Sequence, residues 1–157
     1  MPTITLVEQW EDECKRFNFS HIIKVSSKNQ GWRSEIDDIK LKESLAESDE
    51  SSLSFIIITT YASFSRESTF KQLMSLSKKI QRQMLLIADE AHNIGAPNIM
   101  SKLDRVKILR RIGLSATPER QFDDKGNKAV MQFFGCDAQY TFEYSICLLY
   151  TSPSPRD

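Results

Sequence analysis

The chain has 157 residues, the length of one ordinary domain, and 40% of them are hydrophobic, enough to bury a core. Its 21 basic and 21 acidic residues cancel, so no overall field draws it to nucleic acid or to a membrane, although a local basic face remains open. No apolar run is long enough to span a bilayer, and the N-terminus lacks the basic region of a signal peptide. Cys14, Cys136 and Cys147 are widely spaced and odd in number, which indicates free thiols and a cytoplasmic location.

Short apolar runs alternate with longer amphipathic stretches along the whole chain. The apolar runs are predicted to be strands and lie at 4–7 (ITLV), 21–26 (HIIKVS), 54–60 (SFIIITT), 83–90 (QMLLIADE), 111–116 (RIGLSA) and 139–144 (QYTFEY). The amphipathic stretches are predicted to be helices and lie at 8–17, 32–47, 70–80 and 127–134, the last one closed by Gly135. A polar, acidic loop is expected around 46–52 (AESDESS).

Strands separated by helices of this length favour right-handed βαβ units, so the predicted fold class is α/β with a parallel sheet. The middle strands are apolar throughout, which is typical of a sheet covered on both faces. Ligands of such sheets bind at the carboxyl ends of the strands. Asp89 and Ser115 both stand at a strand end, so a site is expected there.

Two short motifs at these strand ends carry chemistry. Asp89 and Glu90 are adjacent carboxylates, and His92 follows them. One carboxylate beside phosphates can hold Mg²⁺ through water, and its neighbour can position and deprotonate an attacking water. The alternative is a solvated acidic loop. The second motif is GLSATPE at 113–119, whose hydroxyls can bond the neighbouring acids or can form an ordinary turn before proline.

Taken together, LLIADEAHNIG and IGLSATPER resemble the Walker B (DEAH) and SAT motifs of the superfamily 2 DEAD/DEAH-box helicases and translocases. PTITLVEQW and IIITTYASF resemble the segments with which that family contacts a single strand, and FEYSI resembles its exit from the first domain. The closest group is the ResIII-like branch, which includes restriction-enzyme motor subunits and excision-repair-type helicases. The motifs span 2–120 in the family's order.

This resemblance implies a RecA-like P-loop NTPase domain, ATP and Mg²⁺ as cofactors, and an ATP-dependent DNA helicase or translocase as the function. DNA is favoured over RNA as the nucleic acid, and a nuclease or modification subunit is an expected partner. A different class remains open: a non-catalytic nucleic-acid-binding or interaction module that keeps the helicase fold. The intact pair of acids argues against that alternative, because a module without catalysis has no chemical need for both.

The resemblance also implies roles for individual residues. Asp89 would coordinate Mg²⁺ through water, Glu90 would be the catalytic base, and His92 would couple the nucleotide site to the SAT strand. The remaining roles are coupling at Ser115, Ala116 and Thr117, and nucleic-acid contact at Thr3, Gln9, Thr60 and Tyr61. Helix-cap or strand-end duty is an alternative for Thr3 and Gln9. Trp10 and Trp32 can stack on bases, but their spacing favours the core.

None of the five glycines begins the phosphate-binding motif G-x-x-x-x-G-K-[ST]. We therefore expect residues 1–146 to be a partial ATP-binding domain, with the Walker A strand, loop and helix upstream and the second RecA-like domain of the same parent chain downstream. Such a fragment is expected to be inactive alone. Because the strands before Asp89 and Ser115 should be parallel neighbours, the DEAH and SAT side chains are expected to touch, beside an open groove at Asp89.

The last eleven residues, CLLYTSPSPRD, follow neither a helical nor a strand period. One interpretation is a tail without regular structure. The other interpretation, which we prefer, is read-through of foreign DNA. Codons that encode this string resemble a transposase mosaic end joined to a sequencing-library adapter. Residues 147–157 are therefore treated as a non-native tail.

Overall fold

The computed structural model describes residues 4–45, 54–115 and 124–135. In chain order its elements are α1 (Ile4–Arg16), β1 (Ile22–Val25), α2 (Trp32–Leu45), β2 (Ile56–Thr59), α3 (Tyr61–Phe64), α4 (Glu67–Leu73), α5 (Lys78–Gln83), β3 (Leu85–Asp89), the 3₁₀ helix η2 (Ala91–Gly95), α6 (Pro97–Leu103), β4 (Arg110–Leu114) and α7 (Asp124–Phe134). The strand expected at 139–144 and the tail at 147–157 lie outside the described residues, and so does the expected loop at 46–52.

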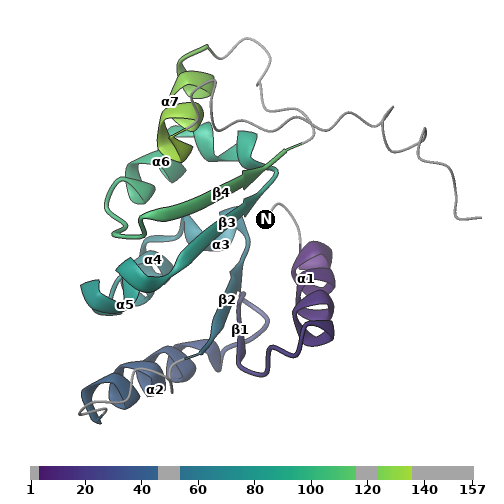
Figure 1. The fold of residues 1–157 in the computed structure, drawn as a ribbon, viewed down its shortest axis with the longest axis vertical. Coiled ribbons are helices and arrows are strands. Elements are labelled where there is room, and N and C mark those ends of the chain that lie inside the picture. Colours follow the sequence, from purple (N-terminus) through teal and green to yellow (C-terminus); the bar gives the residue numbers. More distant parts are fainter. Residues whose placement is uncertain (1–3, 46–53, 116–123, 136–157) are drawn as a thin grey trace, which may run out of the picture.

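The strands pair in parallel, as the sequence predicts. β1 pairs with β2, with Ile22 opposite Ile56, and β3 pairs with β4, with Leu85 opposite Arg110. Helix α2 crosses over between the first pair, and η2 with α6 crosses over between the second. The hydrogen bonds define two sheets of two strands rather than the single sheet expected. The four strands nevertheless run through the middle of the molecule (Figure 1).

The prediction of a strand at 4–7 is wrong, because these residues form the first turn of α1. The β-branched side chains Ile4, Thr5 and Val7 favour a strand locally. The helical spacing of the apolar residues outweighs this local preference, because Val7 is buried at 3% exposure and Trp10 and Cys14 are half-buried on the same face. One continuous amphipathic helix buries more apolar surface than a short strand followed by a helix.

Helix α1 packs against β1 and β2 and stands apart from the other helices, on its own side of the strands (Figure 1). Nothing among the described residues covers the same side of β3 and β4. Their outward side chains Leu85, Ile87, Ile112 and Leu114 are 43% to 47% exposed. The expectation of a sheet covered on both faces is therefore wrong for this strand pair, because no described element lies over it.

Two apolar clusters form the core. One gathers around β3, η2, α6 and α7, and contains Phe70, Ala88, Ile94, Leu103 and Val130 among others. The other gathers around β1 and α2, and contains Ile23, Val25, Trp32, Ile36 and Ile39. Phe64, Met74 and Met84 pack against both clusters, so the two parts share one continuous interior.

The single helix expected at 70–80 is two helices, α4 and α5. The chain breaks at Ser77, whose side chain accepts a hydrogen bond from the backbone N–H of Ile80 at 3.1 Å and so starts α5. Serine residues around this point compete with helical hydrogen bonds, because their hydroxyls bond nearby backbone groups. Helix α7 ends as expected at Gly135, whose φ of +65° suits glycine.

Candidate functional site

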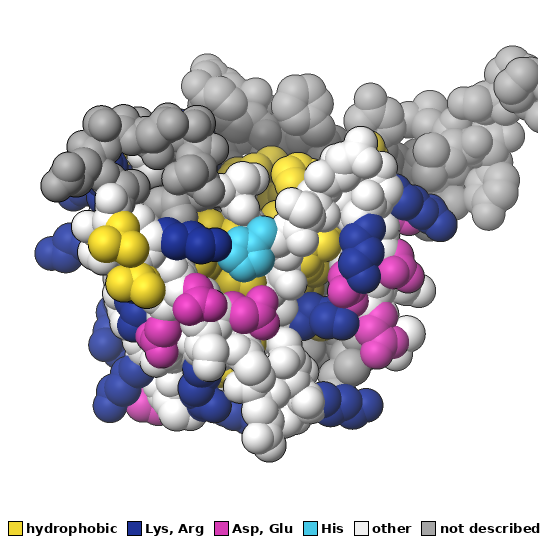
Figure 2. Space-filling view, turned by 90° about the horizontal axis from the view of Figure 1, so that it is seen from below, with side chains coloured by type: hydrophobic (Ala, Val, Ile, Leu, Met, Phe, Trp, Pro, Cys, Tyr) yellow, Lys and Arg dark blue, Asp and Glu magenta, His cyan; other side chains and the backbone are white. Residues whose placement is uncertain are grey.

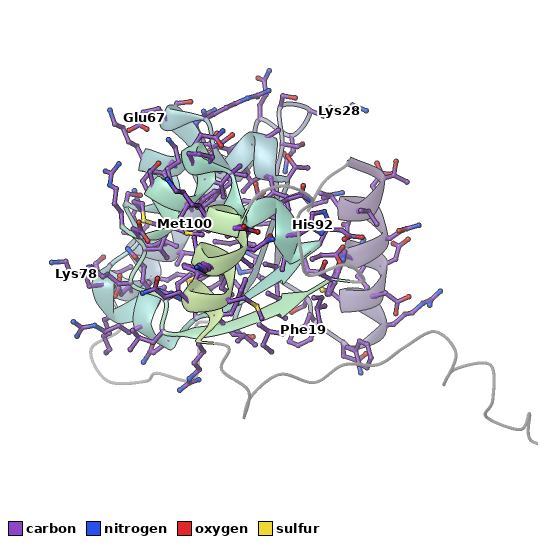
Figure 3. All side chains as sticks on the ribbon, turned by 90° about the horizontal axis from the view of Figure 1, so that it is seen from above. Phe19, Lys28, Glu67, Lys78, His92 and Met100 are labelled. Carbon is purple, nitrogen blue, oxygen red and sulfur yellow. The ribbon has the colours of Figure 1, made fainter. Side chains whose placement is uncertain are left out.

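Strands β3 and β4 bring the two motifs to one edge. Their register places Asp89 opposite Leu114, so the residues that follow each strand emerge side by side. His92 Nδ1 lies 3.0 Å from Ser115 Oγ. In the view of Figure 3, His92 lies between helices α7 and α1. The expected approach of a side chain in 89–92 to one in 115–117 is confirmed, and so is the parallel pairing of the two strands.

The Asp89 side chain stands at the last position of β3, where it accepts two hydrogen bonds. The backbone N–H of Glu90 donates to Oδ1 at 3.1 Å, and Trp10 Nε1 donates to Oδ2 at 3.4 Å. Each carboxylate oxygen has a further lone pair, so both can still accept from water. The indole comes from α1, which is 79 residues away in the chain, and sequence reasoning did not foresee it.

Glu90 has an unusual backbone conformation. Its φ of 51° and ψ of 54° lie in the left-handed region, which costs a non-glycine residue on the order of 1–3 kcal/mol. The Glu90 carbonyl holds this turn by accepting from the backbone N–H of Asn93 at 2.9 Å and from its side chain at 3.2 Å. The Glu90 side chain stays 39% exposed, and its Oε2 lies 3.4 Å from His92 Nδ1. Strain retained at an exposed carboxylate points to a functional position.

Tyr61 reaches the same strand end from the start of α3, which follows β2. Its hydroxyl donates to the Asp89 carbonyl at 2.6 Å. Burial raises the pKa of the Tyr61 phenol first, and the negative charges of Asp89 and Glu90 raise it further. The phenol therefore remains a protonated donor over the whole physiological range.

Thr60 and Gln9, two of the predicted nucleic-acid contacts, have different surroundings. Thr60 is buried, and its hydroxyl caps α3 by accepting from the backbone N–H of Ser63 at 3.1 Å while donating to the Ser63 hydroxyl at 3.0 Å. Gln9 is exposed on α1 beside Trp10. Thr3, Ala116 and Thr117 lie outside the described residues.

A polar cavity of about 350 Å³ opens at the carboxyl ends of β1 and β2. It is lined by Val25, Ser26, Ser27, Asn29, Gln30, Trp32, Arg33, Ser63, Arg66, Ser68 and Thr69. Two guanidinium groups and several hydroxyls suit an anionic ligand. Sequence reasoning missed this set, although the polar residues that follow the strand HIIKV and the turn YASF were a visible signal.

The family model described as type III restriction enzyme, res subunit, matches residues 1–120. The chain belongs to this family. Comparison with the curated proteins gives no match, and neither does comparison with the solved structures. Membership in this family indicates a helicase-family ATPase domain, and such domains generally use ATP and Mg²⁺.

The acidic pair of this res-subunit-type domain fits Mg²⁺. Mg²⁺ keeps several waters and takes one or two carboxylates plus substrate phosphates, rather than a full protein cage. Asp89 offers such a carboxylate at a rigid strand end. Within 4–45, 54–115 and 124–135, no group of three or more His, Cys, Asp or Glu side chains is placed to hold a metal ion.

The surface of the res-subunit-type domain is mixed in charge. On the face seen in Figure 2, Lys and Arg side chains are interspersed with Asp and Glu. This mixture agrees with the net charge of zero, so an anionic partner would be held by local groups such as those of the cavity. None of the helices in the described part of the chain is both long and apolar enough to cross a membrane.

Proposed function

We propose that this chain supplies the water-activating part of a nucleic-acid-dependent ATPase with a RecA-like fold. The observation that carries the proposal is the link between β3 and β4, where His92 Nδ1 lies 3.0 Å from Ser115 Oγ beside Asp89 and Glu90. Four polar groups from two parallel strands converge at one edge, where ligands of α/β sheets bind. The match to the family supports the same conclusion.

The acids divide the work. Asp89 would hold Mg²⁺ through water, and the ion would offset negative charge on the nucleotide phosphates. Glu90 takes the proton of the attacking water, for which its left-handed turn aims an exposed carboxylate outward. His92 Nδ1 lies near both Glu90 Oε2 and Ser115 Oγ, so a change in the position of Glu90 can alter the contact of His92 with the end of β4.

The phosphate-holding half has to come from elsewhere. The chain has five glycines, and none begins a phosphate-binding loop. We therefore propose that a further segment supplies this loop and that a second RecA-like domain supplies an arginine finger. Loss of an arginine finger alone costs about 10³–10⁵ in rate. The 157-residue chain alone is expected to show no ATP hydrolysis that depends on Glu90, as measured by phosphate release.

The polar cavity is the proposed place for the nucleic-acid backbone. Arg33 and Arg66 stand at the starts of α2 and α4, and both line the cavity. Backbone phosphates accept hydrogen bonds from arginine, hydroxyl and amide groups without any reading of sequence. Single-stranded DNA is the proposed ligand, in keeping with the restriction-enzyme description of the family. Exposed Gln9 is a second contact, and Thr60 acts by holding α3 in place.

The catalytic proposal is tested by Glu90→Gln in a coding sequence that also carries the phosphate-binding loop. Loss of a general base is expected to lower the hydrolysis rate by about 10²–10⁴ while nucleotide binding persists. Glu8→Gln is the matched control, because Glu8 is an exposed carboxylate on α1. A Glu90→Gln protein that hydrolyses ATP at the rate of the Glu8→Gln protein would overturn the proposal.

The second candidate, a non-catalytic nucleic-acid-binding module, is favoured by the cavity alone. It predicts single-strand binding with no effect of Glu90→Gln on any nucleotide reaction. Binding itself is measured on this chain by fluorescence anisotropy with Arg33→Ala and Arg66→Ala combined. Under either function, the double variant is expected to bind single-stranded DNA more weakly. The slope of log affinity against log salt concentration is expected to fall by about one unit per lost phosphate contact. Arg82→Ala is the control, since Arg82 is exposed on α5, before the amino end of β3.

Lys28 and Glu67 are each adjacent in sequence to residues that line the cavity. In Figure 3 both lie at one edge of the molecule, and Lys78 of α5 lies away from that edge. Loss of charge at α5 therefore tests whether binding depends on overall charge or on the cavity. Equal weakening by Arg82→Ala and by either cavity arginine would argue against a cavity-based contact.

A further inference from the structure

Asp89 is held from two sides by residues far from it in the chain. Trp10 Nε1 donates to its Oδ2 from α1, and the Tyr61 hydroxyl donates to its carbonyl from α3. We propose that Trp10 and Tyr61 are positioning residues, which together set the orientation of the Asp89 carboxylate according to where α1 and α3 lie. This inference rests on the proposed function, because it concerns the carboxylate assigned to Mg²⁺.

The hydrogen bond from Trp10 can orient the Asp89 carboxylate and still leave its oxygens able to accept from water or bind a metal ion. An indole N–H can only donate, so it can approach Asp89 only as a partner of a carboxylate oxygen. At 3.4 Å the bond is longer than the usual range for N–H···O, so the oxygen keeps most of its capacity for water or metal. Its effect is to favour one side-chain rotamer of Asp89.

Helix α1 presents this indole from a fixed base. Val7 is buried, and Glu11 Oε2 accepts a hydrogen bond from Lys24 Nζ of β1 at 2.5 Å. The helix also packs against β2. Trp10 therefore cannot shift relative to Asp89 unless α1 moves on the strands.

The Tyr61 bond fixes the backbone rather than the side chain. It takes up the Asp89 carbonyl immediately before Glu90, the residue with left-handed φ and ψ. Thr60 caps α3 directly before Tyr61, so the phenol is presented by a defined turn.

The two anchors join the proposed nucleic-acid side to the nucleotide side. Trp10 follows Gln9, an exposed residue proposed to contact nucleic acid. Tyr61 begins α3, whose Ser63 lines the polar cavity. A shift of α1 or α3 when a strand binds would alter the hydrogen bonds of Asp89 directly. This gives a short physical route by which nucleic acid can change the metal-binding geometry, and that route bypasses the contact between His92 and Ser115.

The hydrogen bond of Trp10 can be tested on this chain without nucleotide. The chain has two tryptophans, so the ¹⁵N-labelled protein gives two indole N–H signals, which Trp10→Phe assigns. Asp89→Asn is expected to shift the Trp10 signal and to leave the Trp32 signal unchanged. Mn²⁺ is expected to broaden the Trp10 signal in the unaltered chain and to broaden it less in Asp89→Asn. A Trp10 signal insensitive to Asp89→Asn overturns the role of Trp10.

The positioning role is tested in the ATP-hydrolysing protein that carries the phosphate-binding loop. Trp10→Phe and Tyr61→Phe keep the rings and remove the donors. Each is expected to raise the Mg²⁺ concentration for half-maximal rate and to lower stimulation by single-stranded DNA, by about tenfold for a lost bond to a charged group and less for Tyr61. Ile39→Val is the control for a purely structural effect, because Ile39 is fully buried in the core and does not line the cavity.

The outcomes separate the two proposals. If Glu90→Gln abolishes hydrolysis while both donor variants keep the original Mg²⁺ dependence, the proposed function stands and the positioning role is refuted. If Ile39→Val raises the Mg²⁺ requirement as much as Trp10→Phe, the effect is structural and the positioning role is refuted as well. If the protein hydrolyses no ATP, the proposed function fails, and the indole signals then decide whether Trp10 holds Asp89.

Discussion

Replacing Gly113 with alanine is expected to destabilise the fold at the point where β4 meets η2 and α7. A Cβ at this position would lie 3.0 Å and 3.1 Å from two ring carbons of Phe134 and 3.1 Å from Cβ of Ala91. These contacts are closer than ordinary van der Waals packing allows. Either the Phe134 ring must turn away, or β4 must lift from the layer below it.

The size of the effect follows from two opposing contributions. Overpacking a filled site costs about 1–3 kcal/mol. Removing a glycine restricts the unfolded chain and returns about 0.4–1 kcal/mol. The net loss is about 0–2.6 kcal/mol with a midpoint near ~1.3 kcal/mol, and in a chain of this length each ~1 kcal/mol lowers the melting temperature by about 2–4 °C.

Urea unfolding of the 157-residue chain, followed by circular dichroism, measures this loss. Gly31→Ala is the control, because a Cβ at Gly31 meets only Asn29 Oδ1, at 3.4 Å, and should change stability by less than about 0.5 kcal/mol. In a Phe134→Leu background, Gly113→Ala should cost less, since leucine lacks the ring carbon nearest to the new methyl group. Equal costs in both backgrounds, or a cost no larger than that of Gly31→Ala, would refute the packing argument.

Two further predictions concern α1 and the C-terminal residues. The cations Lys15 and Lys24 lower the pKa of Glu11, so its stabilising effect is present above the unfolded pKa, about 4.3, and is lost as the pH falls through the lower folded pKa. Glu11→Gln should therefore cost roughly 1 kcal/mol at pH 7 and almost nothing at the acid end of a thermal-melt series, and a pH-independent cost would contradict this. Deleting residues 147–157 should leave the melting temperature unchanged if they are a non-native tail, and a drop of several degrees would show that they contribute to the fold.

The position of the site could be predicted because charge ends an apolar strand. MLLIA must stop at Asp89, since a buried unpaired carboxylate costs several kcal/mol, and RIGL stops before Ser115. Parallel strands end at the same edge of a sheet. That these two strands are neighbours was implied by the family resemblance, and together the two arguments predict that their ends meet. The contact between His92 and Ser115 confirms that reasoning.

Other features of the fold and of the candidate site depend on tertiary contacts that a local sequence pattern does not encode. The pairing of the strands into two sheets, the break at Ser77 and the uncovered face of β3 and β4 are set by which neighbours are present. A run such as MLLIA has the same composition whether one face or both faces are covered. The cavity with Arg33 and Arg66 also joins two loops about thirty residues apart, and only the folded chain brings them together.

The error at the N-terminus and the missed role of Trp10 have one physical cause. As a strand, residues 4–7 would end before Trp10 and leave its direction to a loop. As the first turn of α1, they set the helical phase that places Val7, Trp10 and Cys14 along one face toward the strands. That phase, and no local feature of the tryptophan, brings the indole N–H to Asp89. The motif PTITLVEQW is therefore tied to the acidic pair through the helix that it starts, which is the connection a nucleic-acid-dependent ATPase would require.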